Sequence, residues 1–321
     1  MVKLSEIFRS NMIVQAEKPV RFFGEGEGKV EIAFAGENKT ACAKGKWVIE
    51  FEPLPYGGPY QASVLLDGEE TLITGIYAGD VYLLAGQSNM QIKLSQINEP
   101  VEDYKGNPNV RLFTVDRLED EEIFHAKDGW VELTKETAGS FSALGYYVAQ
   151  NLATDNRKIG LIACYQGASV IQTWMPKEVA GREEFIDATP VHGRSVYPLW
   201  NEDGCLFEYQ TSKIIPYSLS TVLWYQGEAN TAEGRKYFEL LKALIESYRE
   251  AFQDEKLPFI VVQLADLKGR LEGWERVQAD QLRAGREIEN VQTVICRDIC
   301  EDNDIHPPTK RPLGKRISDL L

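Results

Sequence analysis

The sequence predicts an α/β protein in which a parallel sheet follows a small all-β sandwich. Three observations support this fold class. Residues 1–78 contain short alternating runs separated by turn residues, residues 79–321 contain continuous apolar runs of strand length, and helical segments alternate with those runs. We therefore predict two domains, a β-sandwich over residues 1–78 and a larger α/β domain over residues 79–321.

The first part of the chain shows the pattern of an all-β domain. Its runs KVEIAFAG, KWVIEFEPL and YQASVLLDG alternate apolar and polar residues, and Gly, Pro, Asn and Asp separate them. No convincing helical period occurs there. Short strands with such turn signals are typical of a small sandwich.

The second part alternates buried strands with amphipathic helices. Helical periods occur over residues 142–155, 234–255 and 274–288. Strands of a parallel sheet are covered on both faces, so they are expected to be continuous apolar runs. The predicted strands are DVYLLAG, NVRLFTV, KIGLIACY, LSTVLWYQ, LPFIVVQLA and VQTVIC.

The charge of the chain limits its partners. Lys and Arg total 35 and Asp and Glu total 49, so the formal net charge is 35 − 49 = −14. An acidic surface repels phosphate backbones and anionic membranes, so we expect neither nucleic acid nor a membrane as the main partner. No apolar signal segment is visible at the start and the five cysteines are scattered, which favours a cytoplasmic protein. A secreted form with a removed signal stays an alternative, and the sequence does not indicate the oligomeric state.

Glycine and amide side chains follow three of the predicted strands. They are Gly86-Gln87-Ser88, Gln166-Gly167 and Gln226-Gly227. The carboxyl ends of parallel strands meet at one edge of the sheet, where ligands bind. Glycine allows a ligand to approach backbone N–H groups, and amides are neutral hydrogen-bond donors. This pattern indicates a site that stabilises a developing oxyanion.

A nucleophilic Ser88 needs a base, and His306 is the candidate. The chain has three histidines, and only His306 follows the last predicted strand and is flanked by the carboxylates Asp302 and Asp304. His125 and His192 lack such neighbours. Cys296 and Cys300 are four residues apart without a second ligand pair, so we interpret them as buried free thiols and expect neither a metal nor a cofactor.

Four sequence blocks resemble a known family. GQSNM, QGASVIQTWMP, WYQGEAN and DIHP are similar to the sialate O-acetylesterase branch of the SGNH hydrolases. The resemblance covers nearly the whole chain, including the first domain. It implies a three-layer, flavodoxin-like SGNH domain and a metal-free serine esterase that removes acetyl groups from sugars. The implied partner is an acetylated sugar or oligosaccharide, for example acetylated sialic acid, acetyl-xylan or acetyl-mannan fragments.

The resemblance also implies roles for single residues. Ser88 matches the nucleophile and His306 the base. The backbone N–H groups of Ser88 and Gly167 match two oxyanion donors, and the side chain of Gln226 matches the third. The superfamily often has aspartate three residues before the histidine, where this chain has Asn303. Asp304 is therefore a tentative acid, with Asp302 or a Ser–His dyad as alternatives.

The substrate rim and the overall function have alternatives. Asn89, Glu228 and Trp174 are candidate rim residues, although Glu228 is better explained by fixing a loop. One rival function is a carbohydrate-binding protein with an impaired esterase site. The other is a lyase or glycosidase with a pair of carboxylates such as Glu228 and Asp304, which would lie about 5–9.5 Å apart.

Overall fold

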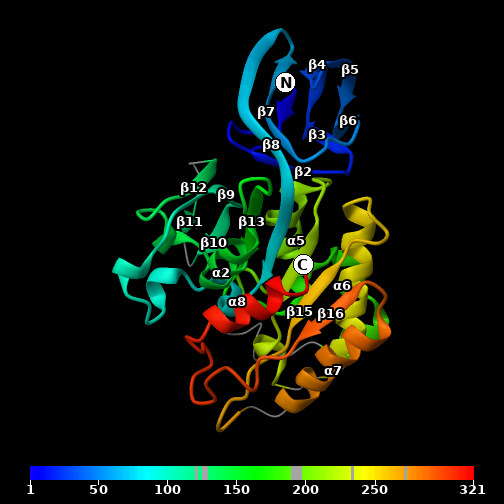
Figure 1. Cartoon of the computed structure of the whole chain (residues 1–321). Helices are drawn as coiled ribbons and strands as arrows, with labels where there is room; N and C mark the ends of the chain where they lie inside the picture. The colour runs from blue at the N-terminus through cyan, green and yellow to red at the C-terminus, as the bar shows by residue number, and fades with distance from the viewer. Residues whose placement is uncertain (120–121, 125–128, 189–196, 233–234, 271–272) are drawn as a thin grey trace.

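The computed structural model describes residues 1–119, 122–124, 129–188, 197–232, 235–270 and 273–321, so His125 and His192 lie outside the described residues. Figure 1 shows the N-terminal strands at one end of the molecule and a helix-covered sheet at the other. The long strand β8 (Glu69–Gly86) runs from one part into the other.

The N-terminal strands pair almost entirely in antiparallel fashion. β3 pairs with β1 and β6, β4 pairs with β5 and β7, and β7 pairs with β8. Phe22, Phe34 and Phe51 are buried between these strands and contact one another edge to face. The strands are β1 (Lys3–Leu4), β2 (Ile13–Gln15), β3 (Val20–Glu25), β4 (Glu27–Phe34), β5 (Glu37–Lys44), β6 (Trp47–Phe51) and β7 (Gly57–Leu66).

Strand β8 belongs to both parts of the molecule. Its first half pairs with β7, its middle pairs in parallel with β2 from Tyr77 to Gly79, and its second half pairs with β13 from Asp80 onward. The predicted boundary between residues 78 and 79 therefore lies inside one continuous strand. The division into two domains stays a prediction.

The second half of β8 lies at the centre of a large mixed sheet. The strand order is β12-β9-β13-β8-β14-β15-β16. All neighbours in it are parallel except β12 and β9. The added strands are β9 (Asn107–Thr114), β12 (Trp130–Leu133), β13 (Ile159–Tyr165), β14 (Thr221–Tyr225), β15 (Phe259–Val262) and β16 (Val291–Val294). A separate antiparallel pair is formed by β10 (Arg117–Glu119) and β11 (Glu122–Phe124).

Three of the α-helices lie where the sequence periodicity predicts them, at residues 143–152, 237–251 and 274–287. Helix α2 begins after Ser142, whose Oγ accepts a hydrogen bond from the N–H of Gly145 and so caps the helix. The α-helices are α1 (Ser88–Gln91), α2 (Ala143–Leu152), α3 (Lys177–Ala180), α5 (Cys205–Tyr209), α6 (Tyr237–Ala251), α7 (Trp274–Glu287) and α8 (Arg311–Ser318). The 3₁₀ helices are η1 (Leu94–Gln96), η2 (Val101–Asp103), η3 (Ala138–Ser140), η4 (Ile171–Trp174), η5 (Glu183–Ala188), η6 (Thr211–Ile214) and η7 (Glu228–Asn230).

Helices cover both faces of the sheet. Leu161 and Cys164 lie three residues apart on β13, and side chains of a strand alternate, so they point to opposite faces. Gly145 of α2 lies against Leu161, whereas Tyr248 of α6 contacts Thr211, which in turn contacts Cys164. Every residue of β13 and β14 is buried. The central strands are therefore enclosed on both faces, as their continuous apolar runs predict.

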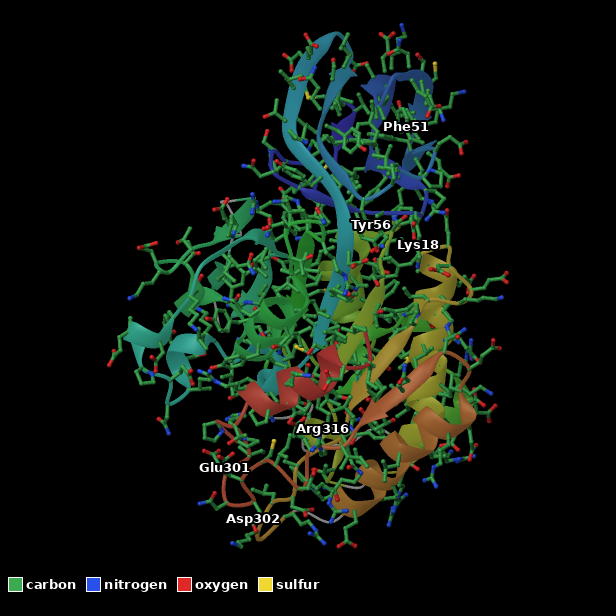
Figure 2. The ribbon with its side chains drawn as sticks, in the orientation of Figure 1. Lys18, Phe51, Tyr56, Glu301, Asp302 and Arg316 are labelled. Carbon is green, nitrogen blue, oxygen red and sulfur yellow. The ribbon has the colours of Figure 1, made fainter. Side chains whose placement is uncertain are left out.

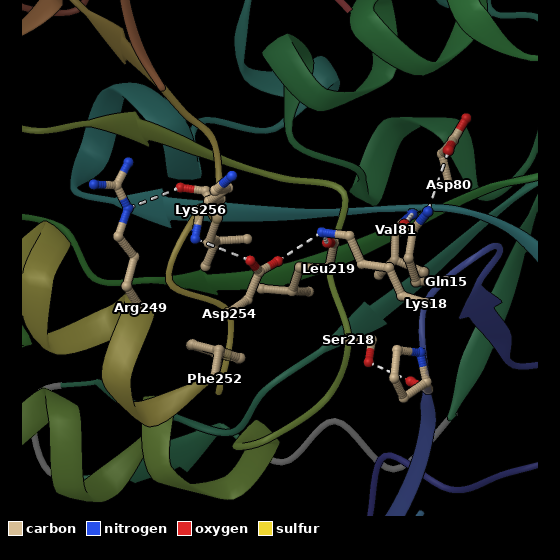
Figure 3. Close-up of polar contacts among 12 residues, drawn as sticks. Gln15, Lys18, Asp80, Val81, Ser218, Leu219, Arg249, Phe252, Asp254 and Lys256 are labelled. Atoms are coloured by element: carbon tan, nitrogen blue, oxygen red, sulfur yellow. Dashed lines mark hydrogen bonds and ion pairs between the residues drawn. The ribbon is translucent and has the colours of Figure 1, made fainter. Parts of the chain in front are cut away.

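Polar contacts join the N-terminal strands to the rest of the molecule. Lys18 Nζ donates to Leu219 O and pairs with Asp254, both at 2.7 Å, and Gln15 Oε1 accepts from the N–H of Val81 at 2.9 Å (Figure 3). The hydroxyl of Tyr217 donates to Ile13 O at 2.7 Å. These bonds link residues that are up to 236 positions apart, so they fix the N-terminal strands against the helix-covered sheet.

Candidate active site

The site begins where β8 ends. Gly86 lies between Tyr165 of β13 and Tyr225 of β14 in the sheet register, and its φ is +124°. A Cβ at this position would lie 2.2 Å from the carbonyl oxygen of Tyr225. Only glycine tolerates this combination of conformation and close approach. The chain can therefore leave the strand sharply and begin helix α1 at Ser88.

Ser88 and His306 come together as the sequence predicts. The distance between Ser88 Oγ and His306 Nε2 is 2.8 Å, which is a hydrogen bond between residues 218 positions apart. Ser88 is half-buried at the first position of α1, and His306 lies on the loop between β16 and α8. Figure 2 shows Glu301 and Asp302 of this loop at the far end of the molecule from Phe51 of the N-terminal strands.

The surroundings of His306 favour the neutral imidazole that a base requires. Partial burial of the ring lowers the pKa of His306, and the charge of Lys310 lowers it further. The carboxylate of Asp304 opposes both effects. His306 therefore stays unprotonated at a lower pH than an ordinary histidine, which is the state that accepts a proton from serine.

Asp304 holds the main chain of His306. Its Oδ1 accepts a hydrogen bond from the backbone N–H of His306 at 2.8 Å. Across the described ranges, no hydrogen bond reaches the ring Nδ1 of His306 from Asp304, Asp302 or another residue. The tentative assignment of Asp304 as an acid that orients the ring through Nδ1 thus does not match this geometry. The arrangement corresponds to the Ser–His dyad alternative.

Gly167 lies beside Ser88, and its backbone N–H already has a partner. This N–H donates to Gln91 Oε1 at 2.6 Å. A Cβ at Gly167 would lie 3.7 Å from the Cβ of Ser88. The amide oxygen of Gln91 therefore takes the place where an ester carbonyl oxygen would accept the same hydrogen bond. Gln91 was not predicted as a site residue, although its position three residues after Ser88 places it on the same face of α1.

The side chain of Gln226 is hydrogen-bonded within the protein, which does not match its predicted role as an oxyanion donor. The side chain is fully buried. Its Nε2 donates to Ser169 O at 3.0 Å and to Asn230 Oδ1 at 2.7 Å, and its Oε1 accepts from the hydroxyl of Tyr237 at 2.8 Å. Both N–H groups are thus used within the protein. Gln226 instead supports the loop that carries Gly167.

Further buried amides support the same loop, and none of them was predicted from the sequence. Asn201 Nδ2 donates to Ala168 O at 2.9 Å, and Asn201 Oδ1 accepts from Val170 N at 2.9 Å. Asn230 Oδ1 accepts from Ile171 N at 2.9 Å. Ala168 has a φ of +52°, which is unusual for a residue with a side chain and needs such support. The loop that carries Gly167 is therefore fixed by three amide side chains from other segments, those of Gln226, Asn201 and Asn230.

Asn89 and Glu228 are buried below the serine, so their prediction as rim residues is wrong. Asn89 is 2% exposed and Glu228 6%. Asn89 Nδ2 donates to Glu228 Oε1 at 2.5 Å and to Ile305 O at 2.9 Å. Lys310 Nζ donates to Asn89 Oδ1 at 2.8 Å. Lys310 was not predicted as a site residue, although it follows His306 by only four positions.

Burial and the neighbouring groups shift the pKa values of Glu228 and Lys310 in opposite directions. Burial raises the pKa of Glu228, while the hydrogen bond from Asn89 and the charge of Lys310 lower it. Burial lowers the pKa of Lys310, and nearby Cys300 and Glu228 raise it. Asn89 thus lies between a buried ammonium and a buried carboxylate, an arrangement in which each charge offsets the desolvation of the other.

Trp174 is also not a rim residue. Its side chain is fully buried, and its indole N–H donates to Ser169 Oγ at 2.8 Å. Its ring contacts Trp224 of β14 edge to face. The indole therefore belongs to the core, and its hydrogen bond to Ser169 fixes the loop after β13.

The assembled geometry can perform nucleophilic acyl transfer. A serine hydroxyl contacts a neutral imidazole, and Gly167 lies beside the serine. The N–H of Ser88 is at the start of a helix, where no intrahelical acceptor exists. A nucleophile, a base and two backbone donors are the groups that cleavage of an ester requires.

Comparison with known proteins points in the same direction. The sequence model of the carbohydrate esterase family described as sialic acid-specific acetylesterase matches residues 78–320. Human sialate O-acetylesterase is 26% identical over 311 residues, which cover 84% of this chain and 59% of the human protein. The rat sialate O-acetylesterase is 25% identical over 353 residues, which cover 87% of this chain and 64% of the rat protein. The chain thus spans about three fifths of the length of these relatives.

A solved structure is similar over the whole chain. A carbohydrate acetylesterase from Xanthomonas citri superposes with a TM-score of 0.82 at 26% sequence identity. The superposition covers 99% of this chain and 74% of the other. The similarity therefore includes the N-terminal strands as well as the sheet that carries Ser88.

Proposed function

The chain belongs to the carbohydrate esterase family of sialic acid-specific acetylesterases, and we propose that it is a serine esterase that removes O-acetyl groups from carbohydrates. The observation that carries this proposal is the 2.8 Å contact between Ser88 Oγ and His306 Nε2 at the carboxyl end of β8. The acetylated sugar is the substrate, and the products are acetate and the free sugar hydroxyl.

The reaction proceeds in two steps through an acetyl-enzyme. His306 Nε2 takes the hydroxyl proton of Ser88 while Oγ attacks the acetyl carbonyl carbon. The backbone N–H groups of Ser88 and Gly167 stabilise the tetrahedral oxyanion. The bond between the carbonyl carbon and the sugar oxygen then breaks, and His306 gives its proton to that oxygen. In the second step His306 takes a proton from water while the water oxygen attacks the carbonyl carbon of the acetyl-serine. The bond between that carbon and Ser88 Oγ then breaks, His306 returns its proton to Oγ, and acetic acid leaves and ionises to acetate.

The strand order supports the finer assignment to the SGNH hydrolase fold. If β8 is counted first and β13, β14, β15 and β16 follow, their order in the sheet is 2-1-3-4-5, which is the flavodoxin-like order. The order reverses between β8 and β14, and Ser88 follows β8 at this point. Ligands of such sheets bind at the switch point. In this assignment β9 and β12 are additions beyond β13.

The alternative function is binding of carbohydrate at an impaired esterase site. Two observations favour it: Asp304 bonds the backbone of His306 rather than its ring, and Gln91 Oε1 accepts the N–H of Gly167. The rival with paired carboxylates gains no such support. Glu228 is buried and bonded to Asn89, so its carboxylate has no free surface toward a sugar.

The substrate class is tested with a panel of esters. O-acetylated sialic acids, acetyl-xylo-oligosaccharides, acetyl-manno-oligosaccharides and 4-nitrophenyl acetate are incubated with wild type and with Ser88→Ala, and acetate is measured by ¹H NMR. We expect turnover that depends on Ser88, with acetylated sugars preferred over the activated ester in kcat/KM. Binding of a sugar in calorimetry without acetate release from any ester would support the alternative.

A further inference from the structure

The loop that carries His306 needs to be fixed, because it is largely exposed. Residues Asn303 to His306 are exposed, yet Nε2 must stay within hydrogen-bond reach of Ser88 Oγ. Bonds within the loop, such as Asp304 Oδ1 to the N–H of His306, set its local shape only. They do not set the position of the loop relative to the nucleophile.

Asn89 makes a contact that joins this loop to helix α1, which carries the nucleophile. It directly follows Ser88 on α1, and its Nδ2 donates to the carbonyl oxygen of Ile305, which directly precedes His306. One end of this hydrogen bond is therefore next to the nucleophile Ser88 in the chain, and the other end is next to the base His306. A change in this bond moves the two reacting side chains relative to each other.

The orientation of the Asn89 amide is imposed by its two charged neighbours. The ammonium of Lys310 can only donate, so it selects the amide oxygen, at 2.8 Å. The carboxylate of Glu228 accepts, so it selects the amide nitrogen, at 2.5 Å. A flipped amide would place oxygen against carboxylate and nitrogen against ammonium. The nitrogen is thereby held toward Ile305 O as well.

We propose that Asn89, clamped between Lys310 and Glu228, is a positioning residue that holds the His306 loop at hydrogen-bond distance from Ser88. The inference rests on the proposed function, because the clamp sets the geometry of the Ser88–His306 pair that performs the proposed reaction. A misplacement of catalytic groups by about 1 Å can lower a rate by about 10²-fold, so this clamp affects turnover without touching the substrate.

The test measures the reactivity of Ser88 directly. A fluorophosphonate probe reacts when Ser88 Oγ bonds to phosphorus, fluoride leaves, and His306 takes the serine proton, so the rate does not depend on which ester is the natural substrate. In Asn89→Asp, the Oδ1 acceptor for Lys310 stays, but the N–H donor to Glu228 and Ile305 O is lost. We expect inactivation and kcat to fall about 10- to 100-fold, with KM within about threefold because the substrate is not contacted.

A double variant separates positioning from stability. In Asn89→Asp/Glu228→Gln, the new amide at position 228 can donate to the new carboxylate at position 89, which relieves the clash of two carboxylates, but nothing donates to Ile305 O. We expect the Tm to recover toward wild type while the inactivation rate stays low. Recovery of the rate together with the Tm would overturn the proposal, as would a wild-type rate in Asn89→Asp.

The chain offers a matched control elsewhere. Asn109 also lies between a lysine and a carboxylate, because its Oδ1 accepts from Lys158 Nζ at 2.5 Å and its Nδ2 donates to Asp155 at 3.4 Å. It lies near the amino ends of β9 and β13, away from Ser88. Asn109→Asp should change the Tm but not the inactivation rate. An equal loss of rate in this control would show a general structural effect and contradict the proposal.

Two further outcomes are decisive. If Asn89→Asp does not fold, Lys310→Met/Glu228→Leu removes both polar partners of the Asn89 side chain while keeping the buried charge balanced, and a wild-type rate in this variant would overturn the proposal. If wild type reacts with the probe but hydrolyses no acetylated sugar, the proposed function fails while the variants still test the clamp. Absence of any reaction of wild type with the probe would overturn both, since no activated serine would exist to be positioned.

Discussion

The partners of His306 determine how much the reaction depends on a neighbouring acid. Asp304 accepts the backbone N–H of His306, and its charge acts on the ring from a distance. In a Ser–His–Asp triad the aspartate instead accepts from Nδ1–H and fixes the tautomer. The two cases predict different results for the same substitution.

We expect Asp304→Asn to keep most of the activity, because the amide oxygen can still accept the N–H of His306. The carboxylate raises the pKa of His306, so its removal lowers this pKa further. The base is active when neutral, and the acid limb of kcat/KM against pH should therefore move to lower pH. A loss of kcat near 10⁴-fold, as for removal of a triad aspartate, would contradict the dyad.

Gln91 gives a second test at the scale of single residues, on how the substrate reaches the N–H of Gly167. Substrate must displace its amide oxygen to accept the N–H of Gly167. One hydrogen bond contributes about 1 kcal/mol net, so Gln91→Ala should lower KM for 4-nitrophenyl acetate by up to about fivefold and leave kcat within about twofold. A large fall in kcat at unchanged KM would show instead that Gln91 takes part in stabilising the oxyanion.

Single residues were predictable where their position after a strand determines their role. Ser88, Gly167 and His306 follow β8, β13 and β16, and the sheet order brings them to one edge. Gln226 follows β14 in the same way, but Gly227 has a φ of 152° and the amide turns into the protein. Trp174 and Asn89 were misplaced because each lies in a helix of only four residues, which is too short to show a periodic pattern in the sequence.

At the scale of elements, strand β8 and helix α1 depend on Gly86. The glycine has a positive φ, and a Cβ added to it would lie 2.2 Å from a backbone oxygen, whereas Gly36 has a φ of +87° and no atom within 4 Å of such a Cβ. The two glycines share the conformational requirement and differ in the space around them. They therefore form a matched pair.

We expect Gly86→Ala to lower the free energy of unfolding by more than about 3 kcal/mol, since strain at a glycine-only conformation costs about 1–3 kcal/mol and overpacking costs a similar amount. Gly36→Ala should cost about 1–2 kcal/mol. Urea unfolding of both variants measures these values. Equal losses in the two variants would mean that the contact with Tyr225 does not constrain the strand end.

The strands and the longer helices follow the predicted pattern, while the boundary predicted between residues 78 and 79 lies inside strand β8. Continuous apolar runs mark β13, β14 and β15 because helices cover both faces. Strand β8 differs, because its first half is largely exposed and its second half is fully buried. The sequence pattern therefore changes from mixed polar and apolar residues to a continuous apolar run within one strand. A change of pattern resembles a boundary in the sequence, although the backbone hydrogen bonds continue across it.

At the scale of the whole molecule, this shared strand and the contacts of Lys18, Ile7 and Ile13 couple the N-terminal strands to the sheet. We expect a single cooperative transition when unfolding in urea is followed by far-UV circular dichroism and by tryptophan fluorescence, with coincident midpoints. Two separate transitions would show that residues 1–78 form an independent unit. None of the helices among the described residues is long and apolar enough to cross a membrane.

The central claim is that Ser88 carries an acetyl group during turnover. The most direct measurement is mass spectrometry of protein that is mixed with 4-nitrophenyl acetate, quenched in acid within the first turnovers and digested. We predict one acetyl group on the peptide that contains Ser88 in wild type, a smaller amount in His306→Ala, and none in Ser88→Ala, which should also release no acetate. Continued hydrolysis by Ser88→Ala, or an acetyl group that accumulates on another residue, would contradict this mechanism.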